Sequence, residues 1–412
     1  MVRGAAHDSG MTAPRAAVRR LALSRLISIT GSAAAYTALT FEIYDRTGSA
    51  AWLAATLLLT EGVSGIAGPI TSVLGDRFDR RVVMLASDGA AAACFAAMAL
   101  VDSPGPLVFV AFLSALAEAP FWPASSAAIP NLVPPEQVSW ANSLIAVGRN
   151  TGIMAGPALG GVLLATLGAP WVFGLNAASF LVSGGLILSV HARFAGDRPD
   201  EQEHRGIMAG FRFLWRERVL RRITAAWVVM VLGIGMAMVG DAPLAKSFDA
   251  GPVGFGLLIG LWGAGSILGS LAGRRLSART ETRWLVLATA FVAAMGFAVA
   301  LSPWFWLVLA LSVAWGVGDG VTVVAEQNIF QRRTPDAVRS RVLGASEGIF
   351  HGTLALSYIA AAFVLPVAGP QGMYALFGAA CALSVLVLLP LLRERTPAVM
   401  PEAVEAVPEG SR

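Results

Sequence analysis

The chain has 412 residues, of which 56% are hydrophobic and only 14% are charged, with a formal net charge of +4. Soluble proteins carry about 25% charged residues, so this composition excludes a soluble globular protein and requires an apolar exterior. The two cysteines, Cys94 and Cys381, lie inside apolar stretches, and we therefore expect no disulfide and no metal site. The first twenty residues contain no apolar stretch, so we also expect no cleavable signal peptide.

Apolar segments long enough to cross a bilayer as helices recur along the whole chain when it is read in windows of about 19 residues. Their number predicts an all-α membrane protein with twelve transmembrane helices. The expected spans are 22–44, 51–74, 82–101, 106–128, 139–167, 170–191, 222–247, 252–273, 283–302, 304–326, 341–367 and 371–392.

The basic residues give the predicted orientation. Of the 29 arginines and one lysine, only Arg46 and Lys246 fall in or at the edge of connections that follow odd-numbered spans, and Arg149 falls well inside a span. Because basic loops stay on the cytoplasmic side, both termini are predicted to be cytoplasmic. The positive net charge then follows from membrane topology, and we expect no nucleic-acid partner.

The longest polar stretch, 193–221, separates the spans into two sets of six. Within it, residues 210–218 alternate basic and bulky apolar side chains, which predicts an amphipathic helix on the cytoplasmic face of the membrane. The expected organisation is a cytoplasmic N-terminal tail at 1–21, a six-helix bundle at 22–192, a cytoplasmic central loop at 193–221, a second six-helix bundle at 222–392 and a cytoplasmic C-terminal tail at 393–412.

The two predicted halves echo each other at an offset of 200 residues. Segment 129–138 aligns with 329–338, and the pair Gly148 and Gly152 aligns with Gly348 and Gly352. Repeated six-helix halves are typical of secondary transporters, which bind their substrate between the halves near the middle of the membrane. The repeat therefore predicts two pseudo-symmetric bundles.

A cluster of two acids and three arginines, 76–81, occupies the short gap between the second and third spans. Asp76, Arg77, Arg80 and Arg81 match the signature loop between the second and third helices of the major facilitator superfamily, which this segment resembles. The resemblance implies that Asp76 clamps the two halves in one conformation by accepting hydrogen bonds at the start of the eleventh helix. The alternative is an anchor of positive charge that fixes topology.

A second motif lies in the span 139–167, where Gly152, Gly156, Pro157, Gly160 and Gly161 combine close helix packing with a bend. It is similar to the motif in the fifth helix of drug–proton antiporters and favours export over import. The alternative is a helix-packing face without directional meaning. Segments 44–49, 123–124, 129–134, 141–143 and 331–336 extend the resemblance to the subgroup of macrolide-efflux and enterobactin-export proteins.

Charged residues inside the spans are functional candidates because each is costly in lipid. Glu118, near the middle of 106–128, is the first choice for a proton carrier, and Arg149 is positioned one span away to pair with Glu118 or Glu61. The alternative is a permanent structural ion pair. The arginine that the family usually carries in its fourth helix is missing here. The complete set of proton-coupling candidates is Glu118, Arg149, Asp319, Asp241, Glu61, Glu347 and His351.

For three of these candidates, the neighbouring residues in the sequence suggest a role. Asp319 lies among Gly316, Gly318 and Gly320, which we interpret as room for a substrate or water, against the alternative of close packing. Glu347 and His351 are four residues apart and share a helix face, as a titratable pair or a structural hydrogen bond. Large aromatic and methionine side chains are the candidates for a substrate pocket: Phe121, Trp122, Trp227, Met230, Trp262 and Trp315.

These patterns predict a secondary transporter in a bacterial inner membrane that exports hydrophobic or amphipathic small molecules in exchange for protons. An apolar pocket with few polar groups suits such substrates. The alternatives are an importer or uniporter of the same fold, or a membrane sensor or scaffold that does not transport. The chain has no phosphate-binding loop for ATP and no catalytic triad, so we expect no enzyme and no cofactor. The expected partners are the substrate, protons and membrane lipid, and the expected state is a monomer.

Overall fold

The computed structural model describes residues 5–62, 78–190, 194 and 207–393. Because a bilayer offers no hydrogen-bond partners, the apolar segments satisfy their backbone groups internally as helices. The helices before residue 190 are α1 Ala5–Thr47, α2 Ala50–Leu57 with the π-helical turn η1 Leu58–Gly62, α4 Arg80–Met98, α5 Pro104–Glu118, α6 Phe121–Leu132, the 3₁₀ turn η2 Pro135–Gln137, α7 Val138–Leu167 and α8 Ala169–Leu188. The later helices are α9 Ile207–Arg216, α10 Arg218–Ser247, α11 Gly251–Gly273, α12 Glu281–Ala300, α13 Phe305–Arg333, α14 Asp336–Leu388 and the 3₁₀ turn η3 Leu389–Arg393.

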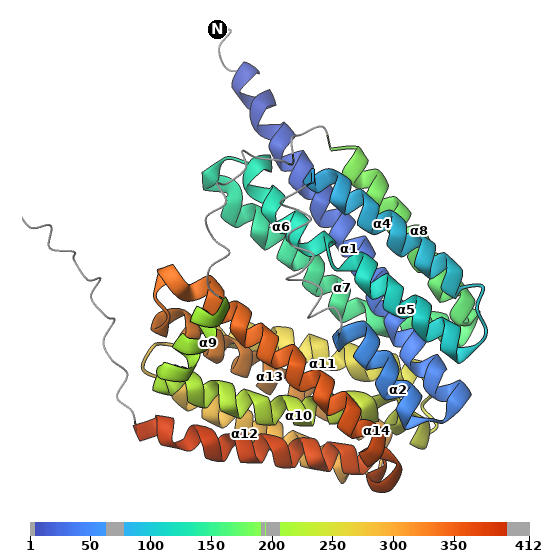
Figure 1. The fold of residues 1–412 in the computed structure, drawn as a ribbon, viewed down its shortest axis with the longest axis vertical. Helices are drawn as coiled ribbons and strands as arrows, with labels where there is room; N and C mark the ends of the chain where they lie inside the picture. The colour runs from blue at the N-terminus through green and yellow to red at the C-terminus, as the bar shows by residue number, and fades with distance from the viewer. Residues whose placement is uncertain (1–4, 63–77, 191–193, 195–206, 394–412) are drawn as a thin grey trace, which may run out of the picture.

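The helices form two groups, which lie above and below one another in Figure 1. In the N-terminal half, α1 packs against α7 and α8, and α4 packs against α8 and α5. In the C-terminal half, α10 packs against α14, and α11 and α12 pack against α13. The two groups are joined where α1 ends and α11 begins, and their ribbons spread apart toward α6 and α9 (Figure 1).

Among the described residues, ten helices have the length and composition to cross a membrane. Two of the predicted spans fall within α14, whose backbone turns at Gly369 (φ 67°) just before Pro370. The predicted span 51–74 is described only as far as Gly62, in α2 and η1. The predicted span 106–128 breaks into α5 and α6, because Pro120 and Pro123 lack the N–H groups that would reach carbonyls one turn earlier.

The amphipathic helix begins and ends earlier in the chain than predicted. Helix α9 ends at Arg216 rather than continuing to residue 218, because the side chain of Glu217 accepts a hydrogen bond from the backbone N–H of Leu220 and so caps α10. Glu217 also forms an ion pair with Arg333 (N–O distance 3.1 Å). On α9 itself, Leu214 is buried against the bundle, whereas Trp215 is 73% exposed. The bounds predicted for the central loop and the two bundles stay a prediction.

Glycines of α7 bring this helix into backbone contact with α1. A side-chain carbon built on Gly156 would collide with Ala33, and one built on Gly160 would collide with the backbone of Ala34. Glycine is therefore needed at both positions for the observed approach of the two helices. The contact lies within the N-terminal half and holds its core together.

The next residue of the same motif serves the interface between the halves. A side-chain carbon on Gly161 would meet the carbonyl of Pro252, and one on Gly256 of α11 would meet the carbonyl of Pro157. Two backbones thus touch across the halves, where side chains normally keep helices apart. The motif predicted from the sequence therefore has two packing faces, one toward α1 and one toward α11.

Polar and aromatic contacts complete the junction, which we call the joined end and define by Asp45, Lys246, Phe41 and Phe255. Lys246 Nζ lies 2.8 Å from Asp45 Oδ1. The rings of Phe41 and Phe255 have centroids 5.9 Å apart. Each contact pairs a residue of α1 with one of the C-terminal half, so α1 and α7 both hold the halves together at this end.

We expect the substitution Gly161→Ala to push α7 away from α11, because the added methyl group meets the Pro252 carbonyl and overpacking costs about 1–3 kcal/mol. The measurement is the distance distribution between spin labels at the exposed positions Thr166 and Ser247, with Cys94 and Cys381 replaced. Its mean should lengthen in Gly161→Ala. The matched control is Gly174→Ala, since Gly174 faces open space. Identical distributions in both variants would show that the contact does not hold the joined end.

Candidate functional site

A half-buried carboxylate lies between α1 and α5 in the N-terminal half. Glu118, the last residue of α5, accepts a hydrogen bond from the Ser32 hydroxyl (2.8 Å) and another from the Tyr36 hydroxyl (2.9 Å). Ser32 and Tyr36 are one helical turn apart on α1, so their side chains share a face. Their two hydroxyl groups hold one carboxylate oxygen each.

Tyr36 connects Glu118 to a second hydroxyl group. Its phenolic oxygen lies 3.0 Å from the hydroxyl of Ser114, which stands one turn before Glu118 on α5. The Tyr36 ring also packs edge-on against Phe95, with centroids 5.7 Å apart. We call Ser32, Tyr36, Ser114 and Glu118 the Glu118 cluster. It is a carboxyl group in a cage of hydroxyls.

The hydroxyl cage belongs to a longer stripe that the sequence analysis missed. Ser24, Ser28, Ser32 and Tyr36 recur every fourth residue on α1, and this spacing was the signal that could have found them. At the start of the stripe, Ser24 lies 2.7 Å from Ser183, whose hydroxyl is also 2.7 Å from a carboxylate oxygen of buried Asp88. Helix α1 therefore contacts Glu118 directly and is linked to Asp88 through the Ser183 hydroxyl of α8.

The arginine nearest to this stripe is also one that the sequence analysis missed. Arg25 lies on α1, close enough to Glu118 and Asp88 to act on both electrostatically. Its guanidinium stacks over the rings of Phe121 (4.7 Å) and Trp122 (5.2 Å). Two of the predicted pocket residues therefore pack against a cation of the protein itself.

The predicted ion pair of Arg149 is absent. In the described part of the chain, Arg149 forms no ion pair with Glu118 or Glu61. Its guanidinium instead lies 5.1 Å from the ring of Trp122, and Glu118 is satisfied by hydroxyl groups. Arg149 lies one predicted span after Glu118, which suggested a pair, but its side chain packs against Trp122 instead.

Glu61 lies in the π-helical turn η1, close to the junction of the halves. It is close enough to Tyr36 of α1 and Tyr358 of α14 to act on both electrostatically, and the neighbouring Gly62 faces Ala355 of α14. Isolated π-helical turns are frequent at functional sites. Glu61 is thus positioned between residues of both halves.

Two carboxylates of the C-terminal half are held by hydroxyl groups as well. Asp241 of α10 accepts a hydrogen bond from the phenol of Tyr374. Asp319 of α13 accepts one from Ser266 of α11 (3.4 Å). The pattern matches that of Glu118, in which a neutral donor rather than a basic side chain satisfies the carboxylate.

The glycines beside Asp319 do not leave the space that the sequence analysis expected. A side-chain carbon on Gly316 would collide with the carbonyl of Trp262, and one on Gly320 with the carbonyl of Ser266. Gly318 faces Phe291 on its other side. The backbone of α11 occupies the space beside Gly316 and Gly320, so these glycines allow close packing of α13 against α11.

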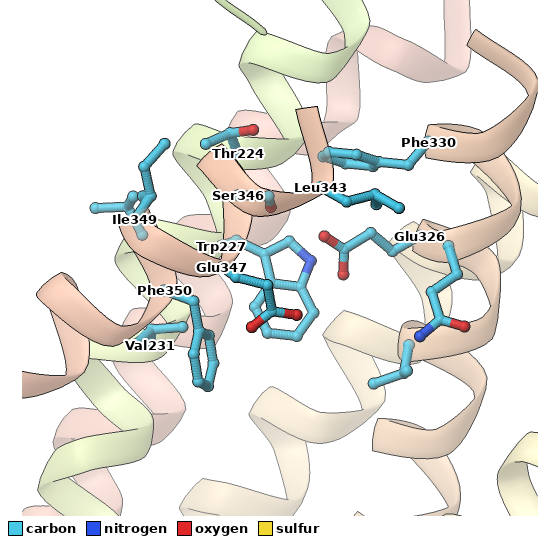
Figure 2. A pocket seen from close by; sticks show the side chains of 13 residues that line it. Thr224, Trp227, Val231, Glu326, Phe330, Leu343, Ser346, Glu347, Ile349 and Phe350 are labelled. Atoms are coloured by element: carbon cyan, nitrogen blue, oxygen red, sulfur yellow. The ribbon is translucent and has the colours of Figure 1, made fainter. Parts of the chain in front are cut away.

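A cavity of about 270 Å³ lies between α10, α13 and α14, and we call it the C-half pocket. Figure 2 shows carboxylates and aromatic rings pointing into it. The indole nitrogen of Trp227 points toward the carboxylate of Glu326 (Figure 2). The residues that give the pocket its chemistry are Trp227, Glu326, Gln327, Phe330, Glu347 and Phe350.

The predicted pair Glu347 and His351 lies at the border of this pocket. His351 Nε2 is 3.8 Å from Glu347 Oε2, and the His351 ring packs edge-on against Phe350 with centroids 5.1 Å apart. Glu347 lines the pocket, whereas His351 stands behind it. Only one member of the pair, Glu347, can therefore contact a compound in the pocket.

The remaining pocket candidates are distributed over several environments. Met230 is buried in the core of the C-terminal half. Trp262 and Trp315 pack together with centroids 6.2 Å apart, and Trp315 also packs against Phe377 (4.6 Å). Trp262 lines a second cavity, between α7 and α11. Of the six candidates, Trp227 is the one that lines the C-half pocket.

Only part of segment 76–81, which resembles the signature loop of the superfamily, lies among the described residues. Asp76 and Arg77 lie outside the described residues, so the predicted clamp stays a prediction. Arg80 donates a hydrogen bond to the carbonyl of Ala127 on α6 (2.8 Å), and Arg81 donates one to the carbonyl of Leu188 on α8 (2.5 Å). Both arginines tie the start of α4 to neighbouring helices of the same half.

Comparison with known proteins identifies the family. Residues 66–408 match the family MFS_3, described as transmembrane secretion effector. The chain belongs to this family of the major facilitator superfamily. The superfamily resemblance predicted from the sequence is therefore confirmed. As a transmembrane secretion effector protein it is a transporter rather than an enzyme, and it is a multi-pass protein of the inner membrane that moves a small molecule.

Individual relatives agree with this assignment. The chain is 27% identical over 335 residues to proteins called enterobactin exporter EntS from Shigella boydii serotype 18 and from Escherichia coli O81, with 80% of each chain covered. These relatives support a major facilitator efflux transporter.

Solved structures agree with the fold. The nucleoside transporter NupG superposes with a TM-score of 0.74 at 12% identity, over 92% of this chain and 100% of the other. A bacterial homologue of the iron transporter ferroportin, in an inward-facing state, gives a TM-score of 0.71 at 16% identity, over 92% and 99%. At these identities the likeness concerns the fold alone, and it confirms the predicted fold class of two pseudo-symmetric six-helix bundles.

We expect Tyr36→Phe to lower the free energy of unfolding in detergent by about 1.5–3 kcal/mol, because Glu118 loses one of its hydroxyl donors while the ring keeps its packing on Phe95. Thermal or denaturant unfolding of the purified protein measures the difference. The matched control is Tyr44→Phe, whose ring keeps its contact with Lys246 Nζ (5.8 Å). An equal loss of stability in the two variants would contradict a special role of the Tyr36 hydroxyl.

Proposed function

We propose that this protein exports hydrophobic or amphipathic small molecules in exchange for protons, by alternating access of a site between its two halves. The family description and the exporter relatives support the direction of transport. The observation that carries the proton coupling is the position of Glu118, a carboxyl group inside a helical bundle that is held by hydroxyl groups. Phosphate-binding motifs are absent from the sequence, so the proton gradient is the proposed source of energy.

A hydroxyl cage suits a carboxyl group that must exist in two protonation states. Ionised Glu118 accepts hydrogen bonds from Ser32 and Tyr36. Protonated Glu118 can itself donate to one of these oxygens, because a hydroxyl is both a donor and an acceptor. An arginine partner in direct contact would instead stabilise the ionised form and oppose proton binding. The cluster can therefore load and release a proton without losing its hydrogen bonds.

Arg25 has a supporting role in this proposal. It lies near Glu118 and Asp88 but stacks on Phe121 and Trp122 instead of forming a close ion pair with Glu118. A cation at this distance moderates the cost of a charged carboxylate in an apolar surrounding and leaves the carboxylate free to protonate. We therefore assign to Arg25 the role of a basic residue near Glu118 that the sequence analysis had assigned to Arg149.

We further propose that both termini face the cytoplasm, as the distribution of basic residues predicts. The joined end, with Asp45 and Lys246, then faces the periplasm, and the halves spread apart on the cytoplasmic side (Figure 1). In this arrangement substrate enters from the cytoplasm. Export requires the contact between Gly161 and Pro252 to break and the two halves to meet at their cytoplasmic ends.

We expect Glu118→Gln to abolish proton movement that is triggered by substrate, because glutamine keeps the shape and the hydrogen bonds but cannot exchange a proton. The measurement uses liposomes that contain the protein and a pH-sensitive dye, challenged with lipophilic cations, macrolides and siderophores. Proton flux should fall more than tenfold. The matched control is Glu136→Gln, which removes an exposed carboxylate in η2 and should leave the flux unchanged.

Three results would overturn the proposal. Proton flux of wild-type size in Glu118→Gln would exclude Glu118 as the carrier. Movement of substrate without any proton flux in the wild-type protein would mean a uniporter or a different coupling ion. Absence of transport for every compound, with intact protein in the liposomes, would favour a sensor or scaffold.

A further inference from the structure

We propose that the C-half pocket binds an organic cation with an aromatic or apolar body. The proposal rests on the export function given above and specifies its substrate class. It is carried by three features of one cavity: two carboxylates, a wall of aromatic rings and an open side.

The two carboxylates make the pocket a site for positive charge. Glu326 of α13 and Glu347 of α14 both line it and lie close enough to repel one another electrostatically. Within the described structure, none of the thirteen lining residues is Lys, Arg or His. His351, whose Nε2 is 3.8 Å from Glu347 Oε2, is not among the lining residues. A bound cation between the carboxylates relieves their mutual repulsion.

The aromatic rings favour a cation over a neutral compound as well. Trp227, Phe330 and Phe350 line the cavity, and the rings of Trp227 and Phe350 meet edge-to-face with centroids 6.2 Å apart. The face of an aromatic ring attracts a cation, because the ring carries partial negative charge on its face. The same rings provide apolar area for the body of the compound. Figure 2 shows the rings of Trp227, Phe330 and Phe350 interspersed with the two carboxylates around one space.

The pocket is accessible from outside the bundle. The side chain of Glu347 is 75% exposed and Leu343 is 40% exposed, so the cavity is open beside α14. A compound larger than the cavity can therefore place its charge between the carboxylates and extend its body through the open side.

The experiment measures binding of radiolabelled tetraphenylphosphonium to the purified full-length protein by equilibrium dialysis. Triphenylphosphine oxide, a neutral compound with similar rings, is the competitor. We expect Glu326→Gln and Glu347→Gln each to weaken binding of the cation about tenfold, and the double substitution to weaken it further. Trp227→Ala should weaken it as well, and Trp227→Phe should weaken it less. The oxide should compete poorly with the cation in the wild-type protein.

The matched control is Glu136→Gln, which removes an exposed carboxylate of the N-terminal half and should bind the cation like the wild type. If a glutamine variant fails to fold, as judged by gel filtration, the inference is tested instead by whether the wild-type protein binds the cation more tightly than the oxide.

Equal binding of cation and oxide, or wild-type affinity in the double variant, would overturn the inference. If macrolides or siderophores drive proton flux while tetraphenylphosphonium does not bind, the inference fails and the export function stands. If the cation binds through Glu326 and Glu347 but no compound drives proton flux, the inference stands and the proposed function fails.

Discussion

Backbone contact between α7 and its two neighbours is the constraint on which the rest of the structure depends. In a bilayer, the lipid is as apolar as the helix surfaces, so helices associate through close van der Waals packing instead of hydrophobic exclusion. Gly160 allows α7 to touch α1, and Gly161 allows it to touch Pro252 of α11. Since the two glycines are adjacent, one helix both builds the N-terminal half and joins it to the other half. A change at the junction is therefore transmitted directly to α1, which carries the hydroxyl stripe.

The second theme is how the bundle accommodates acidic groups without basic partners. A buried charge needs compensation, and here hydroxyl groups provide much of it. Ser32 and Tyr36 contact Glu118, and Tyr374 contacts Asp241. Hydroxyl groups serve both protonation states, whereas an ion pair favours one. The arginines near these sites stack on aromatic rings, as Arg25 and Arg149 do, so they contribute charge at a distance and fix the helix surfaces at the same time.

The two halves echo each other in sequence, but they carry different chemical groups. The N-terminal half contains the hydroxyl stripe and the Glu118 cluster. The C-terminal half contains a cavity with aromatic walls and the carboxylates Glu326 and Glu347. Under the two proposals above, proton exchange and substrate binding lie in separate bundles, and Glu61 in η1 lies between residues of both. Coupling between the sites then requires the halves to move relative to one another, which is the motion that the fold of this superfamily permits.

Hydropathy, charge distribution and the glycine motif determined the helices, their grouping and the family, because these properties depend on composition and on spacing along one helix. The sequence also identified Glu118, Glu347 and Trp227 as unusual residues. Their partners were decided by the tertiary structure. Glu118 meets hydroxyls that are 82 and 86 residues away in the chain, Arg149 turns to Trp122 instead of Glu118, and the glycines beside Asp319 are filled by α11. Helical periodicity shows which residues share a face, but the face that each helix presents to a neighbour is fixed only when all the helices pack together.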